Sequence, residues 1–205
     1  MTIKTFSRMC VVILAGVAIA LSSVAAPKKK DKKPKEEESS GGSGLAAEGM
    51  DELFNQGKKF YEKGNYKEAK KAFERLLQLS PQDDYAPGAR FGVGMCELRT
   101  GNYEHAKDNF EELVAIKELN VKLRENAHMR LGEVAISQNK FDEALLIFRK
   151  VFDEYRNGGE RGAEAKYGQA YAFFKLKNYN KALEIIEDLK KQYPEHEIMP
   201  TLEYF

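Results

Sequence analysis

One pattern of residues occurs four times along the chain, and it limits what the chain can fold into. Each copy opens with an aromatic residue, at steps of 37, 38 and 38 residues: Tyr66, Tyr103, Phe141 and Tyr179. An alanine follows three residues later, and four residues after it comes a large apolar residue: Phe73, Phe110, Phe148 or Ile186. Spacings of three and four place these residues on one face of a helix. A repeat of this length predicts an array of like units, each burying its apolar face against its neighbours.

Within each copy the sequence predicts two helices joined by a short turn. The predicted helices are residues 50–63, 66–79, 87–99, 103–117, 121–138, 141–155, 160–176 and 179–192. Gly64 and Asn65 form the first turn, and Pro81 and Pro194 end the second helix of the first and last copies. Helices of this length are marginal in isolation and depend on stacking. We therefore expect an all-α fold.

These residues resemble the tetratricopeptide repeat, whose 34-residue unit has a small residue in its first helix, an aromatic after the turn, an alanine, another aromatic and a closing proline. The small residues here are Gly57, Gly94, Gly132 and Ala170. The copies depart from the family in their longer period, in Glu97 where an aromatic is usual, and in the third copy, which has no closing proline. The resemblance covers residues 46–194.

The resemblance implies a right-handed superhelix of four repeats, an α-solenoid. Residues 45–194 would form this array, with repeats at about 50–83, 87–120, 121–157 and 160–194. The first helices of the repeats would line a concave groove. Residues 195–205 would form an apolar cap on the last helix pair, because a terminal repeat must cover its exposed face.

The closing segments of two repeats resemble those of exported tetratricopeptide proteins in Gram-negative envelopes. These segments are LQLSPQDDYAPGARFGVG and KKQYPEHEIMP. That group includes the periplasmic partner of the Tol-Pal division machinery and the lipoprotein of the outer-membrane β-barrel assembly machine. The coiled-coil trimerisation segment of the first and the lipid-bearing cysteine of the second have no counterpart in this sequence. The resemblance implies a role in outer-membrane biogenesis or envelope division.

Residues 1–25 have the layout of a secretory signal peptide. Lys4 and Arg8 precede an uninterrupted apolar run at residues 9–21, and small residues follow it. We expect cleavage after Ala25, which predicts an exported, periplasmic protein. The alternative is an uncleaved membrane anchor, which the lysines just beyond the run favour because they resist translocation. The run is short for a bilayer span.

Residues 26–44 are low in complexity, with six lysines, a short acidic block, and then glycines and serines. Such a segment cannot bury enough apolar area to offset its chain entropy, so we expect a disordered linker. Its lysines are most simply a solvated run. The alternative is weak contact with a membrane or an anionic glycan.

Charge and cysteine content argue against a nucleic-acid partner and an internal disulfide. The net charge is +1, and from Leu45 on acidic residues outnumber basic ones, so we expect no nucleic-acid partner. Cys96 is the one cysteine that remains after cleavage, so an internal disulfide is impossible. Its place inside a predicted helix favours a small buried side chain over a reactive thiol.

Counting along the family pattern gives the residues that would face the groove. The candidate peptide-binding residues are Phe54, Lys58, Tyr61, Phe91, Met95, Leu98, Arg99, Met129, Glu133, Tyr167, Tyr171, Phe174 and Lys175. The same count adds Asp51, Glu62, Asn126, Ile136, Ser137 and Glu164. An apolar lining with a basic rim suits an extended or helical peptide with apolar anchors and some acidic character. The alternative, for roughly half of these residues, is packing between repeats.

The sequence offers no recognisable catalytic or metal site. The three histidines, His105, His128 and His196, fall in different repeats, and none has metal-ligand spacing to a carboxylate or cysteine pair. The segment from Glu195 to Glu197 is interpreted as a solvated loop around His196. We therefore expect no enzyme activity, no cofactor, no metal and no small-molecule substrate.

Two functions remain open. In the first, the array is a periplasmic adaptor or scaffold that binds a peptide segment of an envelope protein in its groove, with the linker giving reach. In the second, it is a structural protein that self-associates by stacking end to end through Tyr204 and Phe205. Both functions need only protein or peptide partners in the cell envelope.

Overall fold

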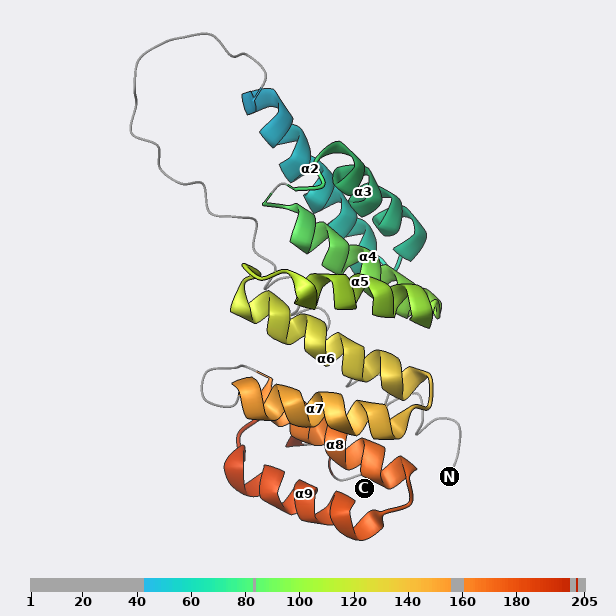
Figure 1. Ribbon diagram of the computed structural model, residues 1–205, viewed down its shortest axis with the longest axis vertical. Coiled ribbons are helices and arrows are strands. Elements are labelled where there is room, and N and C mark those ends of the chain that lie inside the picture. The colour runs from blue at the N-terminus through green and yellow to red at the C-terminus, as the bar shows by residue number, and fades with distance from the viewer. Residues whose placement is uncertain (1–42, 83, 156–160, 200–201, 203–205) are drawn as a thin grey trace, which may run out of the picture. The chain divides into compact units, whose positions relative to one another are not determined.

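The structure, a computed structural model, describes residues 43–82, 84–155, 161–199 and 202. Apart from 3₁₀ geometry at Met199 and Leu202, every regular element in these residues is an α-helix. The helices are α2 (Ser43–Glu62), α3 (Tyr66–Leu79), α4 (Ala86–Thr100), α5 (Tyr103–Ala115), α6 (Val121–Ser137), α7 (Phe141–Tyr155), α8 (Gly162–Lys175) and α9 (Tyr179–Gln192), as Figure 1 shows. The expected all-α fold is confirmed.

The helix ends lie close to the predicted ones with one exception. The predicted bounds of α3, α7 and α9 are those of the structure. Helix α2, however, begins at Ser43, ahead of the predicted start at Met50 and inside the segment predicted as a linker. Leucine, alanine and glutamate, which favour helix, occupy residues 45–48 and extend it upstream. The predicted signal peptide and most of the predicted linker lie outside the described residues.

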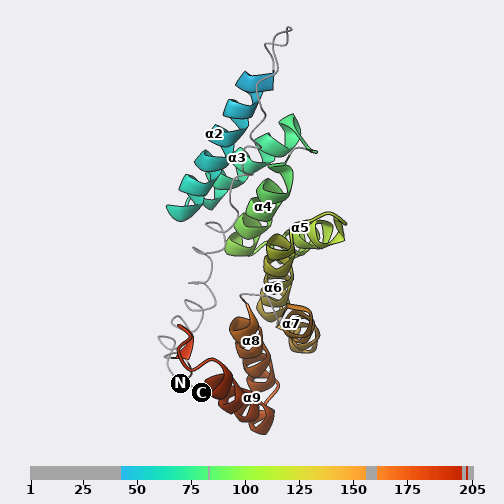
Figure 2. The same ribbon diagram turned by 90° about the vertical axis from the view of Figure 1, so that its left-hand side faces the viewer.

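The described residues up to Asn109 belong to one compact unit and those from Phe110 on to another. We call these the N-terminal unit and the C-terminal unit. In the N-terminal unit, α3 packs against α2 and α4, and α2 also contacts α4. In the C-terminal unit, α7 packs against α6 and α8, α6 also contacts α8, and α9 packs against α8 (Figure 2). In each unit, then, the second helix of one repeat packs against the first helices of two successive repeats.

The turn inside each helix pair has the same backbone geometry in all four repeats. Its central residue has a positive φ, which is 77° at Gly64, 83° at Gly101, 59° at Asn139 and 61° at Lys177. The N–H of the next residue donates to the carbonyl five residues back, as from Asn178 to Phe173 at 2.9 Å. This is the Schellman helix end, which normally takes glycine at the left-handed position. The conserved geometry keeps the two helices of each repeat antiparallel.

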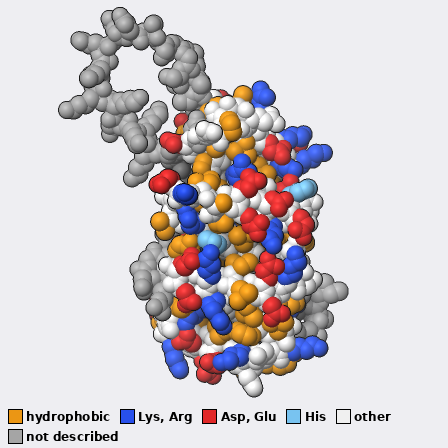
Figure 3. All heavy atoms as spheres, in the orientation of Figure 1, with side chains coloured by type: hydrophobic (Ala, Val, Ile, Leu, Met, Phe, Trp, Pro, Cys, Tyr) orange, Lys and Arg blue, Asp and Glu red, His pale blue; other side chains and the backbone are white. Residues whose placement is uncertain are grey.

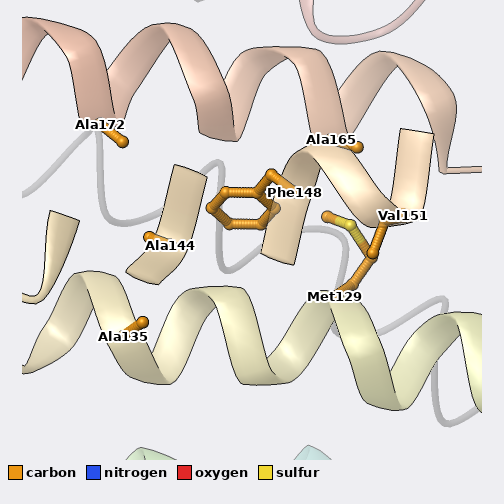
Figure 4. Close-up of a cluster of buried hydrophobic side chains, with 7 residues drawn as sticks. All are labelled: Met129, Ala135, Ala144, Phe148, Val151, Ala165 and Ala172. Carbon is orange, nitrogen blue, oxygen red and sulfur yellow. The ribbon is translucent and has the colours of Figure 1, made fainter. Parts of the chain in front are cut away.

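The Phe148 ring in α7 fills the space between α6 and α8. A Cβ atom added at Gly132 of α6 would lie 2.5 Å from this ring, and one added at Gly168 of α8 would lie 2.6 Å from it. Figure 4 shows the ring between the two helices, beside Met129 and Val151. The contact leaves room only for glycine on both sides, so one ring fixes how closely the first helices of the third and fourth repeats approach.

Phe73 in α3 has the same place in the N-terminal unit. A Cβ atom added at Gly57 of α2 or at Gly92 of α4 would lie 2.6 Å from its ring. The small-residue positions predicted at Gly57 and Gly132 are thus confirmed. The second contact of each ring, with Gly92 or Gly168 of the following repeat, was not predicted.

In the fourth repeat the corresponding apolar residue is Ile186 of α9. It belongs to a buried cluster with Ala170 of α8 and with Ile198 and Leu202, which follow α9. These last two side chains are only 4% and 3% exposed. The described part of the segment after α9 therefore packs against α8 and α9, while residues 200–201 and 203–205 of the predicted cap lie outside the described residues.

The surface and the thiol give two further results. None of the described helices has the length and hydrophobicity needed to cross a bilayer. On the face seen in Figure 3, basic side chains are interspersed with acidic ones.

Cys96 is 1% exposed, and burial raises the pKa of its thiol to about 12, so the thiol stays protonated near neutral pH. This confirms the prediction that Cys96 is a packing residue.

Candidate functional site

A pocket of about 40 Å³ lies between α6 and α8 in the C-terminal unit. Its apolar wall includes Met129, Ile136, Tyr167, Tyr171 and Ile198. Four of the sequence-predicted binding residues line it: Met129, Glu133, Tyr167 and Tyr171. The close approach of α6 and α8 across Phe148 brings these residues of two successive repeats to one place.

Two ion pairs form the charged part of the pocket wall. The Arg130 guanidinium donates from Nη1 to both carboxylate oxygens of Glu133, at 2.6 Å each. The Arg161 guanidinium donates from Nη1 to Glu164 Oε1 at 3.0 Å. Arg130 and Arg161 are 1% and 6% exposed, and charges buried to this degree need such partners. The formal charges of the four side chains cancel.

Arg161 also holds the start of α8 against α6. Its backbone N–H donates to Glu125 Oε1 at 2.9 Å, and its side-chain Nε donates to Asn126 Oδ1 at 3.0 Å. Glu125 and Asn126 are both buried in α6. The sequence placed Asn126 on the groove face, and the structure gives it to this contact between successive repeats.

Among the charged side chains of the pocket wall, two buried polar atoms have no hydrogen-bond partner in the residues that the structure describes. One is the donor Arg130 Nε and the other is the acceptor Glu164 Oε2. His196 Nε2 lies 3.9 Å from Glu164 Oε2, which is within ion-pair distance for a protonated imidazole but beyond hydrogen-bond distance. A buried polar atom without a partner costs free energy and needs an explanation.

The other two predicted residues of the C-terminal unit, Phe174 and Lys175, lie near the end of α8 and outside the pocket wall. The Phe174 ring packs edge-on against Tyr179 of α9, with centroids 5.6 Å apart. Lys175 Nζ lies 5.5 Å from the centroid of the Tyr171 ring. Lys175 thus places a positive charge beside one of the aromatic rings of the pocket.

Three predicted residues of the N-terminal unit are part of its core. Phe54 is 2% exposed, and its ring centroid lies 5.8 Å from those of Phe73 and Tyr85. Phe91 and Met95 of α4 are fully buried. Phe54 therefore packs between elements of the unit, which was the alternative left open for about half of the candidates.

Two of the remaining predicted residues of the N-terminal unit, Tyr61 and Arg99, contact each other. Arg99 Nε donates to the Tyr61 hydroxyl at 2.9 Å, and the Tyr61 ring packs against Tyr66 with centroids 5.2 Å apart. Burial raises the pKa of Tyr61 to about 12, and the hydrogen bond from Arg99 only partly opposes this. Lys58 and Leu98 are half-buried.

Repeat counting missed Arg130, Arg161 and Ile198. Arg130 precedes Glu133 by three residues on one helix, which is ion-pair spacing and was the available signal. Arg161 lies at the N-cap of α8 and Ile198 lies after α9, and counting along the family pattern gives neither residue a groove-facing position. His196, predicted in a solvated loop, is half-buried, and its Nδ1 accepts the N–H of Ile198 at 3.3 Å.

Across the part of the chain that the structure describes, no group of three histidine, cysteine, aspartate or glutamate side chains could hold a metal ion. The chemistry of the pocket is therefore that of paired charges and apolar walls, with one donor and one acceptor of the charged side chains that make no hydrogen bond within the described residues.

Family comparison identifies the class of protein that this fold defines. A tetratricopeptide-repeat family model matches residues 50–83, and a second one matches residues 129–197. Together they cover half of the chain. The chain belongs to the tetratricopeptide-repeat proteins, whose stacked helix pairs serve as scaffolds for protein–protein interaction. A search of curated proteins found no match.

Solved structures agree on the fold. The apo form of RapI is 17% identical, with a TM-score of 0.64, over 72% of this chain and 57% of RapI. MamA (residues 41 to the end) from Desulfovibrio magneticus RS-1 is 20% identical, with a TM-score of 0.56, over 72% of this chain and 77% of that chain. A tetratricopeptide-repeat protein from Parabacteroides merdae is 16% identical, with a TM-score of 0.59, over 73% of this chain and 56% of that chain. At these identities the likeness concerns the fold alone.

Proposed function

We propose that this protein is a non-catalytic adaptor that binds a peptide segment of a partner protein at the pocket between α6 and α8. The gathering of four predicted groove residues, Met129, Glu133, Tyr167 and Tyr171, around that pocket supports the proposal. Mainly apolar walls with a few fixed polar groups are typical of sites that bind ligands. Lys175 beside the pocket suits a peptide that also carries an acidic residue.

The proposed place of action is the periplasm, and the proposed partner is an envelope protein of outer-membrane biogenesis or envelope division. The signal-peptide layout of residues 1–25 and the resemblance to exported envelope proteins support this. Residues 26–42 would act as a tether, with their lysines near the membrane or an anionic glycan if the apolar run stays uncleaved.

Affinity capture from solubilised cell envelope tests the proposal. Wild type is compared with the Tyr171→Ala, Phe174→Ala double variant, and captured proteins are identified by mass spectrometry. Leu146→Ala is the matched control, because Leu146 lies on α7 with 69% of its surface exposed. We expect a partner that wild type and the control retain and that the double variant loses while keeping its helical circular dichroism. Identical captures by all three proteins would overturn the proposal.

A second candidate function is self-association, and the exposed face of α9 favours it. Tyr179 and Leu183 of α9 are 52% and 51% exposed. Their equivalents in the third repeat, Phe141 and Leu145, are partly buried against the cluster that α8 completes. None of the described residues therefore covers the face of α9 that would receive a further helix. Tyr204 and Phe205, which were predicted to make this contact, lie outside the described residues.

The partner we propose for this face is α9 of a second copy. Helix α2, in the first repeat, is a less suitable partner for this apolar face. It has a polar surface formed by Glu52, Asn55, Gln56 and Lys59. Sedimentation analysis of Leu183→Lys tests the idea, with Leu146→Lys as the control of similar exposure. We expect wild type and the control to dimerise with concentration and Leu183→Lys to stay monomeric. A monomeric wild type at all soluble concentrations would exclude this function.

A further inference from the structure

Two polar atoms of the charged side chains in the pocket wall, Arg130 Nε and Glu164 Oε2, have no hydrogen-bond partner within the described residues. We infer that the pocket binds the side-chain carboxamide of a glutamine or asparagine in the partner peptide, an inference that rests on the proposed function. Arg130 Nε would donate to the carboxamide oxygen, and Glu164 Oε2 would accept a hydrogen bond from the carboxamide NH₂.

Charge balance favours a neutral ligand over a charged one. The pocket wall carries two arginines and two glutamates, and each arginine is already paired with a glutamate. A ligand carboxylate would bring a third negative charge next to Glu133 and Glu164 and would have no proton for Glu164 Oε2. A ligand ammonium would have no acceptor for Arg130 Nε. A carboxamide carries both the acceptor and the donor that are needed.

The two protein groups are held in place before a ligand arrives. Glu133 fixes the Arg130 guanidinium through two hydrogen bonds of 2.6 Å, and Arg161 fixes the other carboxylate oxygen of Glu164 at 3.0 Å. Arg130 is 1% exposed, so its Nε bears the desolvation cost whether or not a ligand is bound. A ligand that satisfies it therefore gains a hydrogen bond without ordering a mobile side chain.

The size of the pocket suits the same group. A water molecule needs roughly 10–15 Å³ of such volume, so a pocket of about 40 Å³ has room for about three atoms of that size. A carboxamide has three heavy atoms, whereas a phenyl ring has six. The apolar wall at Met129 and Ile136 would cover the methylene groups that carry the carboxamide.

Peptide display on the full chain tests this inference. A random peptide library is selected on wild type, and the affinities of selected peptides are measured by fluorescence anisotropy. We expect glutamine or asparagine to recur at one position of the selected peptides. Replacing that residue by glutamate, lysine or methionine should weaken binding at least about tenfold, because each replacement lacks the donor, the acceptor or both.

A charge-neutralising variant tests whether the preference for an amide arises at the pocket. Glu164→Gln removes the negative charge that rejects a carboxylate, so the preference for the glutamine peptide over its glutamate counterpart should fall from about tenfold to less than about threefold. Glu195→Gln is the control, because Glu195 is exposed in the loop before His196, and it should leave the preference unchanged.

The outcomes separate this inference from the function on which it rests. One outcome is that selected peptides bind wild type more tightly than Tyr171→Ala and yet show no preference for an amide. That result would overturn the carboxamide inference and leave the adaptor function intact. If no peptide is selected, or if Tyr171→Ala binds the selected peptides as tightly as wild type does, the adaptor function and the carboxamide inference both fail. An amide preference that Glu164→Gln does not change would also overturn the inference, since the ligand would then be recognised elsewhere.

Discussion

At the scale of single residues, the Phe148 ring limits the size of the side chains that α6 and α8 can have where the two helices meet. Gly168→Ala would place a Cβ atom 2.6 Å from that ring, closer than real Cβ contacts come. The ring is 3% exposed and surrounded by other side chains, so it cannot simply move away. We expect Gly168→Ala to lower the free energy of unfolding by about 1–3 kcal/mol, measured by urea denaturation followed by circular dichroism.

Gly49→Ala is the matched control for this substitution. Gly49 is also helical, in α2, but a Cβ atom there meets no atom within 4 Å. Alanine favours helix over glycine by about 0.5–1 kcal/mol, so this variant should be as stable as wild type or more stable. Equal destabilisation by both alanines would show that the Phe148 contact is not the cause.

Glu97, which stands where the family usually has an aromatic residue, is explained by an ion pair. The carboxylate is 3% exposed, lies 2.5 Å from Lys70 Nζ, and accepts a hydrogen bond from Asn102 Nδ2 at 2.7 Å. Burial raises the pKa of the Glu97 carboxyl, but the hydrogen bonds from Lys70 and Asn102 outweigh burial and leave this pKa below its ordinary value. A polar pair between α3 and α4 thus replaces an aromatic contact.

The direction of this pKa shift sets a pH dependence. A carboxyl group with a lowered pKa in the folded state stabilises the fold above its unfolded pKa of about 4.3, and the stabilisation is lost as pH falls through the folded pKa. Glu97→Gln should therefore lower the free energy of unfolding by about 1–2 kcal/mol at pH 7, and the difference from wild type should shrink toward pH 3. Urea denaturation at several pH values measures this difference.

Glu68→Gln serves as the control for Glu97→Gln. Glu68 forms an ion pair with Lys71 at 3.0 Å, but both side chains are about half exposed or more. Exposed pairs contribute little, so we expect a change within about 0.5 kcal/mol and little dependence on pH. A wild-type advantage over Glu97→Gln that stays constant down to pH 3 would contradict the ion-pair account.

At the scale of helices, the turn between α8 and α9 has lysine, which does not favour a positive φ, where two of the equivalent turns have glycine. Lys177 has a φ of 61°, a backbone conformation that costs a residue with a Cβ atom about 1 kcal/mol relative to glycine. The first two repeats have Gly64 and Gly101 there. We expect Lys177→Gly to raise the free energy of unfolding by about 0.5–1 kcal/mol, measured as a shift in thermal or urea midpoint.

Lys71→Gly tests whether the gain comes from backbone conformation. Lys71 is exposed in the interior of α3, where glycine costs about 1 kcal/mol in helix propensity. The same chemical change should therefore have the opposite sign at the two positions. A loss of stability in Lys177→Gly would mean that the lysine side chain contributes more than its backbone conformation costs.

The helices could be predicted from the sequence because their signals are local. The bounds of α3, α7 and α9 follow from an aromatic at the first position and apolar residues spaced by three and four. The start of α2 could not be predicted, because Ser43 and Gly44 resemble linker by composition while the residues after them favour helix. At the candidate site, Met129 and Tyr171 follow from repeat counting, but Arg161 depends on contacts with Glu125 and Asn126 in another repeat.

At the scale of the whole molecule, the proposed periplasmic location depends on residues 1–25. A basic start, an apolar run and small residues up to Ala25 are what signal peptidase requires, whereas an anchor would keep the apolar run. We expect the full-length chain, expressed in a Gram-negative host, to be recovered from the periplasm with Ala26 as its first residue. Intact-mass spectrometry measures this as the loss of residues 1–25.

Ala25→Tyr is the control for cleavage, because a bulky side chain next to the scissile bond blocks the peptidase that needs a small one there. This variant should keep its full mass and fractionate with membranes, while its repeats fold as in wild type. If wild type also keeps its full mass and stays with membranes, the apolar run is an anchor. The lysines at residues 28–30 would then lie at the membrane surface, and residues 26–42 would tether the repeats there.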